Sequence, residues 1–560
     1  MSIKGFFQEG KWLRHFESAA IGLFLAASIF VLVPTFASTE DTVPVDSDIS
    51  IQAFAYAMPD NGWAPLTVYF SAFGTDAAAS ITRYEWDLDG NGLFETDATA
   101  NGGYASYTYT KPRDYTISLR VTGKNGNTSI AQTSVNVRHP ASSSVDYWTI
   151  FDDSRIRRVD IKLTKQNWDS MWADPGEKLM VPADAVVFGR RIQNAGLSTK
   201  GNSTLWFPGD KKPLKLDINA YIPEQEYKNL KMLLFHNNFG DPSMLREKLS
   251  YDLMRFAGVA AGHVAYAEVW LDVVDDEDPP TYAGVYTMVE RPDRKFLANR
   301  FGRENDGGSL YKADAWFEEG AADLAYYGED IQYYPKPRGE IAYRLMYTDD
   351  YDYNDIIHLC QTIDGVEYDN PEEFAAALEE VFHVDSFLRY LAVIFTTLNF
   401  DQYPDTGNNY YIYSNPGTGK FEWIAWDMNN SWGNFGGGTD YPLFRTGPSI
   451  GPLQYAPLYE KIIEVEDYRR DYLAYVDLLL RHRYNEKYIG EQAWKFHAMI
   501  RPHLEKGNGD QMYFGDNAQS SLEEFDSSVE ALIDLTRERS NYISEIIINS
   551  NQITDMDKEE

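Results

Sequence analysis

The sequence is poor in cysteine and in positive charge. It has one cysteine, Cys360, in 560 residues, and 50 Lys and Arg against 85 Asp and Glu, for a net charge of −35. A single thiol excludes an intramolecular disulfide, and it excludes the zinc-ribbon and iron–sulfur sites that need several thiolates. The acidic balance argues against a nucleic-acid partner, because binding a phosphate backbone requires a basic face. We expect Cys360 to be a small buried hydrophobic residue.

Several short catalytic signatures are also absent. The chain has no GxxxxGK[ST] phosphate loop, no HExxH string, and neither an HRD nor a DFG string. These absences argue against a P-loop ATPase, a zincin-type metalloprotease and an ordinary protein kinase. The histidines are isolated, so we expect them to be core or surface residues rather than metal ligands; those considered are His236, His263, His358 and His383.

The N-terminus carries three basic residues before an uncharged run of fifteen residues, 19–33, and then the small-x-small string 35–37. This pattern predicts a signal peptide over residues 1–37 and a mature N-terminus near Ser38. The alternative is an uncleaved anchor, although the run is shorter than the ~20 residues of a spanning helix. Either interpretation predicts a secreted or cell-surface protein whose membrane contact is limited to this segment.

Residues 46–139 have the pattern of an all-β domain. Short alternating segments rich in β-branched and aromatic residues are separated by turn residues such as Asn125-Gly126, which is typical of a β-sandwich. The predicted strands cover 67–70, 81–86, 107–109, 115–121 and 134–137. A polar segment, 140–150, is expected to be a linker.

Residues 151–549 have a mixed α/β (α+β) pattern, and residues 550–560 are expected to be a frayed tail. We predict a helix over 243–256 with Ser243 as N-cap and Gly258 as its stop. An acidic, tyrosine-rich stretch, 313–353, is expected to be an insertion or a lid. Helices are expected over 455–549. Strands are expected at 158–163, 185–188, 214–218, 265–271 and 285–289, and as a hairpin at 409–413 and 421–426.

One turn of the first domain has the residue types of a calcium loop. Asp87, Asp89 and Asn91 place oxygens at alternate positions before Gly92. The alternative is a β-turn satisfied by hydrogen bonds alone. Through residues 84–87, 103–109 and 114–117 the domain resembles PKD domains, which implies an immunoglobulin-like β-sandwich that acts as a spacer or binding module without catalysis.

The second region contains two polar clusters that suit phosphate chemistry. The first joins a Gly/Ser turn to lysines, which could hold phosphate oxygens or could be a solvated basic strand. The second joins Asp401, Asn409, Asp427 and Asn429 at the ends of adjacent elements, as a magnesium and general-base site or as capping residues. The first cluster comprises Lys200, Asn202, Ser203, Lys211, Lys212 and Lys215.

With both clusters in one chain, residues 159–549 resemble the CotH family of spore-coat-type atypical protein kinases. Asn429 stands where many relatives carry a second aspartate, and Asp401 and Asn409 are eight residues apart. The matching runs are 200–203 with 211–216, 245–251, 282–290, 310–312, 399–401 with 409–413, and 426–427.

This resemblance implies a two-lobed kinase-like fold that binds ATP and Mg²⁺ between a β-rich lobe and a helical lobe. Asp401 would be the catalytic aspartate with Asn409 as helper, and Asp427, Asn409 and Asn429 would hold magnesium. Arg246 would sit on the helix that positions the lysines. The residues implied at the nucleotide are Lys200, Asn202, Ser203, Lys212, Lys215, Glu247, Glu290 and Lys312.

Two functions therefore remain open from the sequence. The first is an exported kinase that phosphorylates Ser or Thr of surface or secreted proteins. The second is a non-catalytic adhesin or scaffold that binds carbohydrate or matrix, since some members of the family are thought to lack activity. Aromatic residues of the predicted hairpin, among them Tyr410 and Trp423, could form a sugar platform but are better explained as core.

Overall fold

The structure is a computed structural model that describes residues 51–75, 81–139, 149–205, 211–274, 279–316, 319–348, 352–445, 449, 451–506 and 518–556. The predicted signal peptide, 1–37, and residues 140–148 of the predicted linker lie outside the described residues. Among the described helices, none combines the length and the apolar character needed to cross a membrane.

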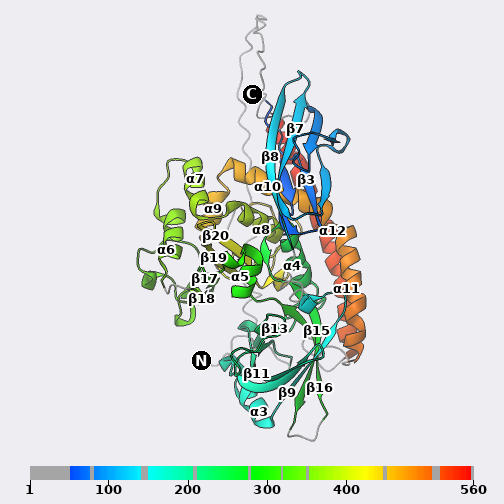
Figure 1. The fold of residues 1–560 in the computed structure, drawn as a ribbon, viewed down its shortest axis with the longest axis vertical. Coiled ribbons are helices and arrows are strands. Elements are labelled where there is room, and N and C mark those ends of the chain that lie inside the picture. Colours follow the sequence, from blue (N-terminus) through cyan, green and yellow to red (C-terminus); the bar gives the residue numbers. More distant parts are fainter. Residues whose placement is uncertain are drawn as a thin grey trace, which may run out of the picture. The chain divides into compact units, whose positions relative to one another are not determined.

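The first domain is a sandwich of two β-sheets (Figure 1). One sheet has the order β1-β3-β6 and the other β2-β8-β7-β4-β5. Alternate residues such as Val68, Phe70, Trp86 and Leu119 are fully buried between the sheets, so the predicted β-sandwich is confirmed. The strands are β1 (Tyr56–Met58), β2 (Asn61–Trp63), β3 (Leu66–Ser71), β4 (Ile81–Asp87), β5 (Thr96–Asp97), β6 (Ala105–Tyr109), β7 (Arg113–Gly123) and β8 (Thr128–Arg138).

A closed seven-stranded barrel follows, in the order β10-β11-β12-β13-β16-β15-β9. Alternation along the strands places Leu216 and Phe235 in the barrel core, while Leu234 packs outside with the core of the helical region. The five strands predicted here are present; β11 and β13 were not predicted. The elements are β9 (Arg157–Leu163), α3 (Lys165–Ala173), β10 (Val181–Val187), β11 (Arg190–Thr199), β12 (Leu214–Asp217), β13 (Met232–His236), β15 (Val264–Val273) and β16 (Thr281–Val289).

Helix α4 (Arg246–Ala257) lies between β13 and β15 in the chain and packs against both the barrel strand β15 and helix α8 (Val384–Thr396). It ends, as predicted, at Gly258, which adopts a left-handed conformation with φ +89° that favours glycine. It begins three residues later than predicted, and Asp241, rather than Ser243, accepts the hydrogen bond from the amide of Arg246, at 2.8 Å. A carboxylate at a helix N-terminus is favoured by the helix dipole, which explains the difference.

The second sheet has the order β14-β20-β19-β17-β18 and lies among helices. The predicted hairpin is formed by β19 and β20, and Tyr410 stacks on Trp423 with ring centroids 4.1 Å apart. Both rings are fully buried, so they belong to the core and are not an exposed sugar platform. The strands are β14 (Ala260–Ala261), β17 (Leu310–Ala313), β18 (Tyr343–Tyr347), β19 (Tyr410–Asn415) and β20 (Lys420–Ala425).

The predicted insertion or lid at 313–353 belongs instead to this sheet and its core. Strand β18 pairs with β17, and Leu324 and Tyr343 are fully buried. The hydroxyl of Tyr343 accepts a hydrogen bond from the amide of Leu324, at 2.7 Å. Two tyrosines of this segment, Tyr334 and Tyr343, are buried, whereas Tyr327 and Tyr333 are exposed. The buried positions follow no regular repeat along the chain, so the periodicity of the segment does not predict its packing.

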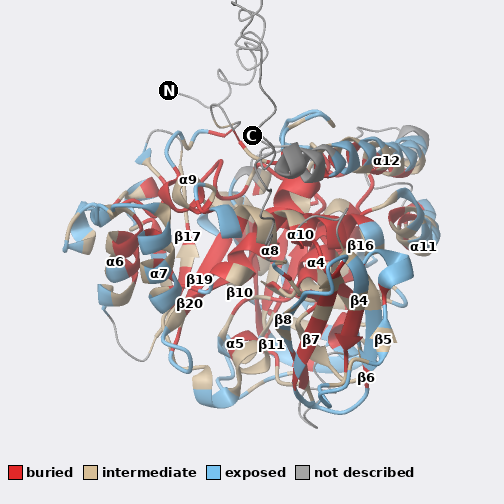
Figure 2. Cartoon of the chain, turned by 90° about the horizontal axis from the view of Figure 1, so that it is seen from above, coloured by how far each residue is buried: buried red, intermediate tan, exposed pale blue. Residues whose placement is uncertain are grey.

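Helices form most of the remaining chain, and Figure 2 shows the buried residues concentrated around α8, α10 and β19–β20. Cys360 is fully buried, as predicted. Helix α12 continues to Met556, beyond the start of the predicted frayed tail. The helices are α5 (Arg294–Phe301), α6 (Asn354–Cys360), α7 (Pro371–Val381), α8 (Val384–Thr396), α9 (Pro457–Ile462), α10 (Glu466–His482), α11 (Glu486–Lys506) and α12 (Ala518–Met556).

The β-sandwich packs on α8 and α10 of the second region. The hydroxyl of Tyr56 donates to Asp471 at 2.7 Å, and that of Tyr104 donates to Asp477 at 2.8 Å. The buried guanidinium of Arg389 donates to the carbonyl of Ala57, at 3.0 Å. The expected spacer module is thus joined to the second region by buried polar contacts.

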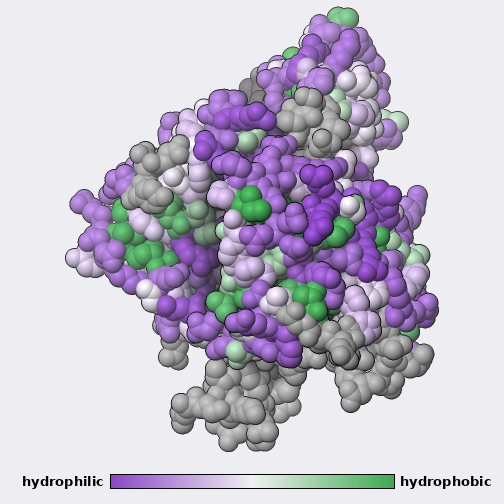
Figure 3. All heavy atoms as spheres, turned by 60° about the horizontal axis from the view of Figure 1, so that its bottom comes forward, coloured by the Kyte–Doolittle hydropathy of each residue, from purple (hydrophilic) through white to green (hydrophobic). Residues whose placement is uncertain are grey.

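The face in Figure 3 is mostly hydrophilic, with small separate hydrophobic patches, as the acidic composition predicts.

Candidate functional site

The candidate site joins residues from the barrel, helix α4 and the second sheet. Lys200 follows β11, and Glu247 lies in the first turn of α4. Lys312 lies on β17, and Asp427 lies two residues after the end of β20. Asp427 shifts the pKa values of Lys200, Lys312 and Asp401, so these groups lie within electrostatic range of one carboxylate. The structure therefore brings together residues from both predicted clusters.

The backbone of Asp427 is held from two sides. Its amide donates to the hydroxyl of Tyr251 on α4 at 3.1 Å, and its carbonyl accepts from the side-chain amide of Gln402 at 3.1 Å. Asp427 adopts a left-handed conformation, φ +54°, which is uncommon outside glycine and concentrates at functional sites. Both Tyr251 and Gln402 are fully buried, so the position of the aspartate is fixed by the core.

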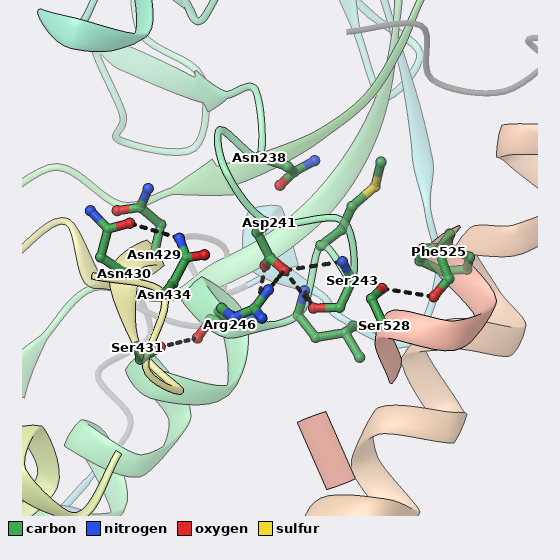
Figure 4. Close-up of polar contacts among 12 residues, drawn as sticks. Asn238, Asp241, Ser243, Arg246, Asn429, Asn430, Ser431, Asn434, Phe525 and Ser528 are labelled. Atoms are coloured by element: carbon green, nitrogen blue, oxygen red, sulfur yellow. Dashed lines mark hydrogen bonds and ion pairs between the residues drawn. The ribbon is translucent and has the colours of Figure 1, made fainter. Parts of the chain in front are cut away.

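The loop after Asp427 is also tied to the start of α4. The side-chain amide of Asn429 donates to the carbonyl of Phe239, at 3.3 Å, and the hydroxyls of Ser431 and Ser250 are 2.7 Å apart. Figure 4 shows this loop beside Asp241, which pairs with the guanidinium of Arg246 at 2.6 Å. Arg246 thus stabilises the start of α4, and hydrogen bonds join this helix to the loop after Asp427.

Asp401 has two asparagine partners. The side-chain amide of Asn430 donates to its carboxylate at 2.7 Å, and that of Asn409 donates to its backbone carbonyl at 2.7 Å. Burial raises the pKa of Asp401 to about 7; the hydrogen bond from Asn430 lowers this pKa, and the charge of Asp427 raises it. A carboxylate that changes its protonation near neutral pH suits a general base.

Two lysines carry positive charge to this site. Burial lowers the pKa of Lys200, while the carboxylates of Asp427 and Glu247 favour its charged form. Burial lowers the pKa of Lys312 to about 8, and the nearby guanidinium of Arg344 contributes to this lowering. Two partly desolvated ammonium groups thus lie within electrostatic range of Asp427, in a chain whose net charge is −35.

Glu247 pairs with a histidine that the sequence does not mark as functional. A side-chain oxygen of Glu247 lies 2.8 Å from Nδ1 of His236, and His236 packs edge-on against Trp426. Burial raises the pKa of Glu247 to about 8 and lowers the pKa of His236 to about 3. His236 is therefore a neutral imidazole at physiological pH.

The remaining predicted residues have other partners. Burial lowers the pKa of Lys215 on β12, and its charged neighbours are Asp217 and Arg291. Glu290 pairs with Arg300 at 2.8 Å and accepts from the amide of His263, so it has a structural role. Asn202 accepts a hydrogen bond from Lys178, at 3.0 Å.

Two further predicted residues are described through the backbone. The carbonyl of Lys212 accepts a hydrogen bond from the hydroxyl of Tyr286, at 3.1 Å. Ser203 begins a short 3₁₀ helix, Ser203–Leu205, directly after Asn202. Neither observation places these side chains at Asp427.

Sequence reasoning missed His236, Tyr251, Gln402 and Asn430. Tyr251 could have been found, because it follows Glu247 by four residues and so lies on the same face of the predicted helix. His236 lies on β13, which the pattern does not predict as a strand. Asn429 and Asn430 are adjacent residues of the same type. The 3₁₀ turn Met428–Asn430 directs the side chain of Asn430, and not that of Asn429, to Asp401.

Ser449, the serine of a GxSxG string at residues 447–451, is not at the position of a hydrolase nucleophile. That motif requires its serine at a sharp turn from a strand to a helix. Ser449 lies in neither a strand nor a helix, and its hydroxyl donates to the carboxylate of Asp405 at 2.6 Å.

The turn expected to bind calcium has hydrogen bonds to its oxygens. The carboxylate of Asp87, which is buried, accepts from the amides of Gly90 at 2.8 Å, Asn91 at 3.1 Å and Gly92 at 2.8 Å. Asp89 accepts from the amide of Asn91, and the side-chain oxygen of Asn91 accepts from the amide of Leu93. This is the geometry of the alternative, a hydrogen-bonded turn; calcium binding stays a prediction.

Fold and site define the class of this protein: a PKD-like β-sandwich followed by a kinase-like α/β region with a helical C-terminal part. The family model described as CotH kinase protein matches residues 197–543, and that described as PKD domain matches 54–138. The chain belongs to the CotH kinase family and carries an N-terminal PKD domain.

Known proteins similar to this chain come from several bacteria. Inner spore coat protein H of Bacillus subtilis (strain 168) is 24% identical over 388 residues, which cover 69% of this chain and 93% of that protein. The crystal structure of the Helicobacter pylori proinflammatory kinase CtkA is 12% identical with a TM-score of 0.19, over 61% of this chain and 96% of that one. The PKD1 domain of the Vibrio cholerae metalloprotease PrtV is 23% identical with a TM-score of 0.13, over 16% of this chain and 99% of that one.

Proposed function

We propose that this kinase-like protein is an atypical protein kinase that transfers the γ-phosphoryl group of ATP to Ser or Thr of surface or secreted proteins. The observation that carries the proposal is that Asp401 and Asp427 have different surroundings, which suit different chemical roles. Asp401, with a pKa of about 7, is bonded to Asn430, whereas Asp427 faces the ammonium groups of Lys200 and Lys312. One carboxylate suits proton transfer and the other suits a metal–phosphate complex.

The residues present fit Mg²⁺ and ATP. Carboxylate and amide oxygens of Asp427, Asn409 and Asn429 are the hard ligands that magnesium prefers, and Lys200 and Lys312 would pair with phosphate oxygens. Bound Mg²⁺ would supply neutralisation of the phosphate charge. Asp401 would accept the proton of the acceptor hydroxyl, while Asn430 orients its carboxylate. Glu247 would hold Lys200, whose charged form it favours.

The proposed location is extracellular or at the cell surface. The chain has a PKD domain, a relative in the spore coat, and an N-terminal pattern that predicts a signal peptide. Under this proposal the acceptors are proteins exported with the kinase or present at the same surface. N-terminal sequencing of the exported protein checks the predicted start near Ser38; an intact Met1 in the membrane fraction would favour the anchor.

The decisive experiment measures nucleotide binding and transfer on the same purified full-length chain. Millimolar Mg-ATP should raise the melting temperature by mass action, and γ-labelled ATP should label Ser or Thr of exported proteins. Asp534→Asn, on the exposed side of α12, is the matched control and should behave like the parent. If the parent shows neither a thermal shift nor transfer, the kinase proposal fails.

The second candidate is a non-catalytic surface or matrix-binding protein. The observation that favours it is the PKD domain, which is packed on α8 and α10 rather than at the candidate site. This candidate predicts binding of the chain to cell-surface or matrix material that is unchanged in Asp401→Asn and Asp427→Asn.

A further inference from the structure

Three potential metal ligands from three elements converge beside the proposed phosphate site. One ring nitrogen of His236 and one carboxylate oxygen each of Glu247 and Asp427 lie within 4.8 Å of one another. His236 comes from β13, Glu247 from α4, and Asp427 from the turn after β20. His236 is 7% exposed and Glu247 is 3% exposed, so the cluster is largely withdrawn from water.

Nε2 of His236 lacks a hydrogen-bond partner among the described residues, whichever of His236 and Glu247 carries the shared proton. Its Nδ1 is bonded to Glu247, but its buried Nε2 has no hydrogen-bond partner among the described residues. If Glu247 is ionised, Nδ1 donates and Nε2 keeps a bare lone pair. If Glu247 carries the proton, Nδ1 accepts and the Nε2 hydrogen lacks an acceptor. A buried polar atom without a hydrogen-bond partner is costly, and a bound ion is one of the ways in which proteins satisfy it.

We propose that His236, Glu247 and Asp427 bind a borderline divalent cation, with Zn²⁺ as the type case, when no nucleotide is present. Imidazole nitrogen selects zinc and similar transition metals, whereas magnesium prefers oxygen ligands alone. Three protein ligands with an open position are also the pattern of accessible zinc sites. This site differs from the proposed magnesium site, because two of its ligands, His236 and Glu247, have no part in magnesium binding there.

Lys200 is the natural competitor of such a cation. Lys200 lies within electrostatic range of Asp427 and Glu247, and their carboxylates favour its charged form. A bound dication would repel that charge, so the cation and the lysine exclude one another. Since Asp427 serves both sites, zinc should also weaken binding of Mg-ATP. The cation site itself requires only its three ligands and does not depend on phosphoryl transfer.

The test uses the full-length chain, purified without a histidine tag, treated with chelator and free of nucleotide. Titration with Zn²⁺ by calorimetry should show one site, and Co²⁺ should give the visible absorption of a low-coordinate complex with nitrogen and oxygen ligands. Changes in outer-shell partners already cost about 10–100-fold in metal affinity. His236→Gln and Glu247→Gln should therefore each lower Zn²⁺ affinity by at least roughly 10-fold.

His383→Gln is the matched control. Its Nδ1 also lies 2.8 Å from a glutamate oxygen, that of Glu422, but His383 belongs to no such group of three among the described residues. The control should bind Zn²⁺ like the parent. Equal affinity in the parent, His236→Gln and His383→Gln would overturn the proposal.

A second variant keeps the test decisive if His236→Gln does not fold. Lys200→Met leaves all three ligands in place and removes the competing charge, so Zn²⁺ should bind more tightly than in the parent. Unchanged or weaker Zn²⁺ binding in Lys200→Met would overturn the proposal. Because no nucleotide is used, failure of the zinc site and failure of the kinase proposal are separate results.

Discussion

The hydroxyl of Tyr251 on helix α4 accepts a hydrogen bond from the backbone amide of Asp427, at 3.1 Å. Tyr251 lies one helical turn after Glu247, so one helix places a carboxylate in the site and also fixes the backbone of the aspartate. Any displacement of α4 would therefore change both residues together.

Tyr251→Phe should lower both stability and affinity for Mg-ATP. It leaves the backbone amide of Asp427 without its acceptor, at a cost of about 1–3 kcal/mol. Thermal melting with and without Mg-ATP measures both effects. The control is Tyr266→Phe, which removes a hydroxyl that donates to the carbonyl of Met244, at 2.7 Å, before the same helix. It should reduce stability only; equal loss of nucleotide affinity in both variants would contradict the special role of Tyr251.

The two aspartates should fail in different ways. Asp427→Asn should weaken Mg-ATP binding and abolish transfer, because the metal loses its charged ligand. Asp401→Asn should leave nucleotide affinity nearly intact while the rate falls by roughly 10² to 10⁴. Calorimetry with Mg-ATP and single-turnover labelling measure the two quantities. If both variants bind Mg-ATP like the parent, and the parent itself transfers no phosphate to any exported protein, the catalytic assignment is wrong and the two aspartates are structural caps.

Phosphoryl transfer should increase with pH through the pKa of Asp401, about 7. A general base acts when deprotonated, so the rate should rise roughly 50-fold from pH 5 to pH 7 and level off above pH 8. Asn430→Ala removes a hydrogen bond that lowers this pKa, so the midpoint should move to higher pH. Asn370→Ala, which changes the N-cap of α7, should leave the midpoint in place. A pH-independent rate would exclude Asp401 as the base.

The β-sandwich should unfold together with the second region. Arg389 is buried and pairs with Asp60 of the sandwich, at 3.4 Å, and with Asp385 of its own helix, at 2.7 Å. Asp60→Ala should therefore destabilise the chain by about 3 kcal/mol or less, since Asp385 still partners the guanidinium. The exposed Asp114→Ala is the control. Calorimetry should show one transition for the parent; two separate transitions would contradict the coupling.

Asp87→Ala should lower the melting temperature equally in calcium and in chelator. The substitution removes the acceptor of three backbone amides, each bond worth about 1 kcal/mol. Equal melting temperatures of the parent in both conditions would mean that the turn is satisfied by these hydrogen bonds alone. A rise in the parent's melting temperature with calcium would support the calcium interpretation of Asp87, Asp89 and Asn91.

Local patterns in the sequence were sufficient for the β-sandwich, most of the barrel strands, the end of α4 at Gly258 and the β19–β20 hairpin. These features depend on alternation of apolar residues and on turn chemistry, which act between near neighbours in the chain. The family resemblance likewise singled out Asp401 and Asp427, because these residues belong to short motifs in a fixed order.

Only the tertiary structure decided which lysines face Asp427 and what His236 contacts. Lys215 lies on a regular strand, yet its charged neighbours are Asp217 and Arg291, whereas Lys200, just beyond β11, lies within range of Asp427 and Glu247. His236 and Asp427 are 191 positions apart and meet only in the folded chain, where His236 at the end of β13 also bonds to Glu247 on α4. Burial then sets their charge states, and burial is a property of the packed core that no local pattern contains.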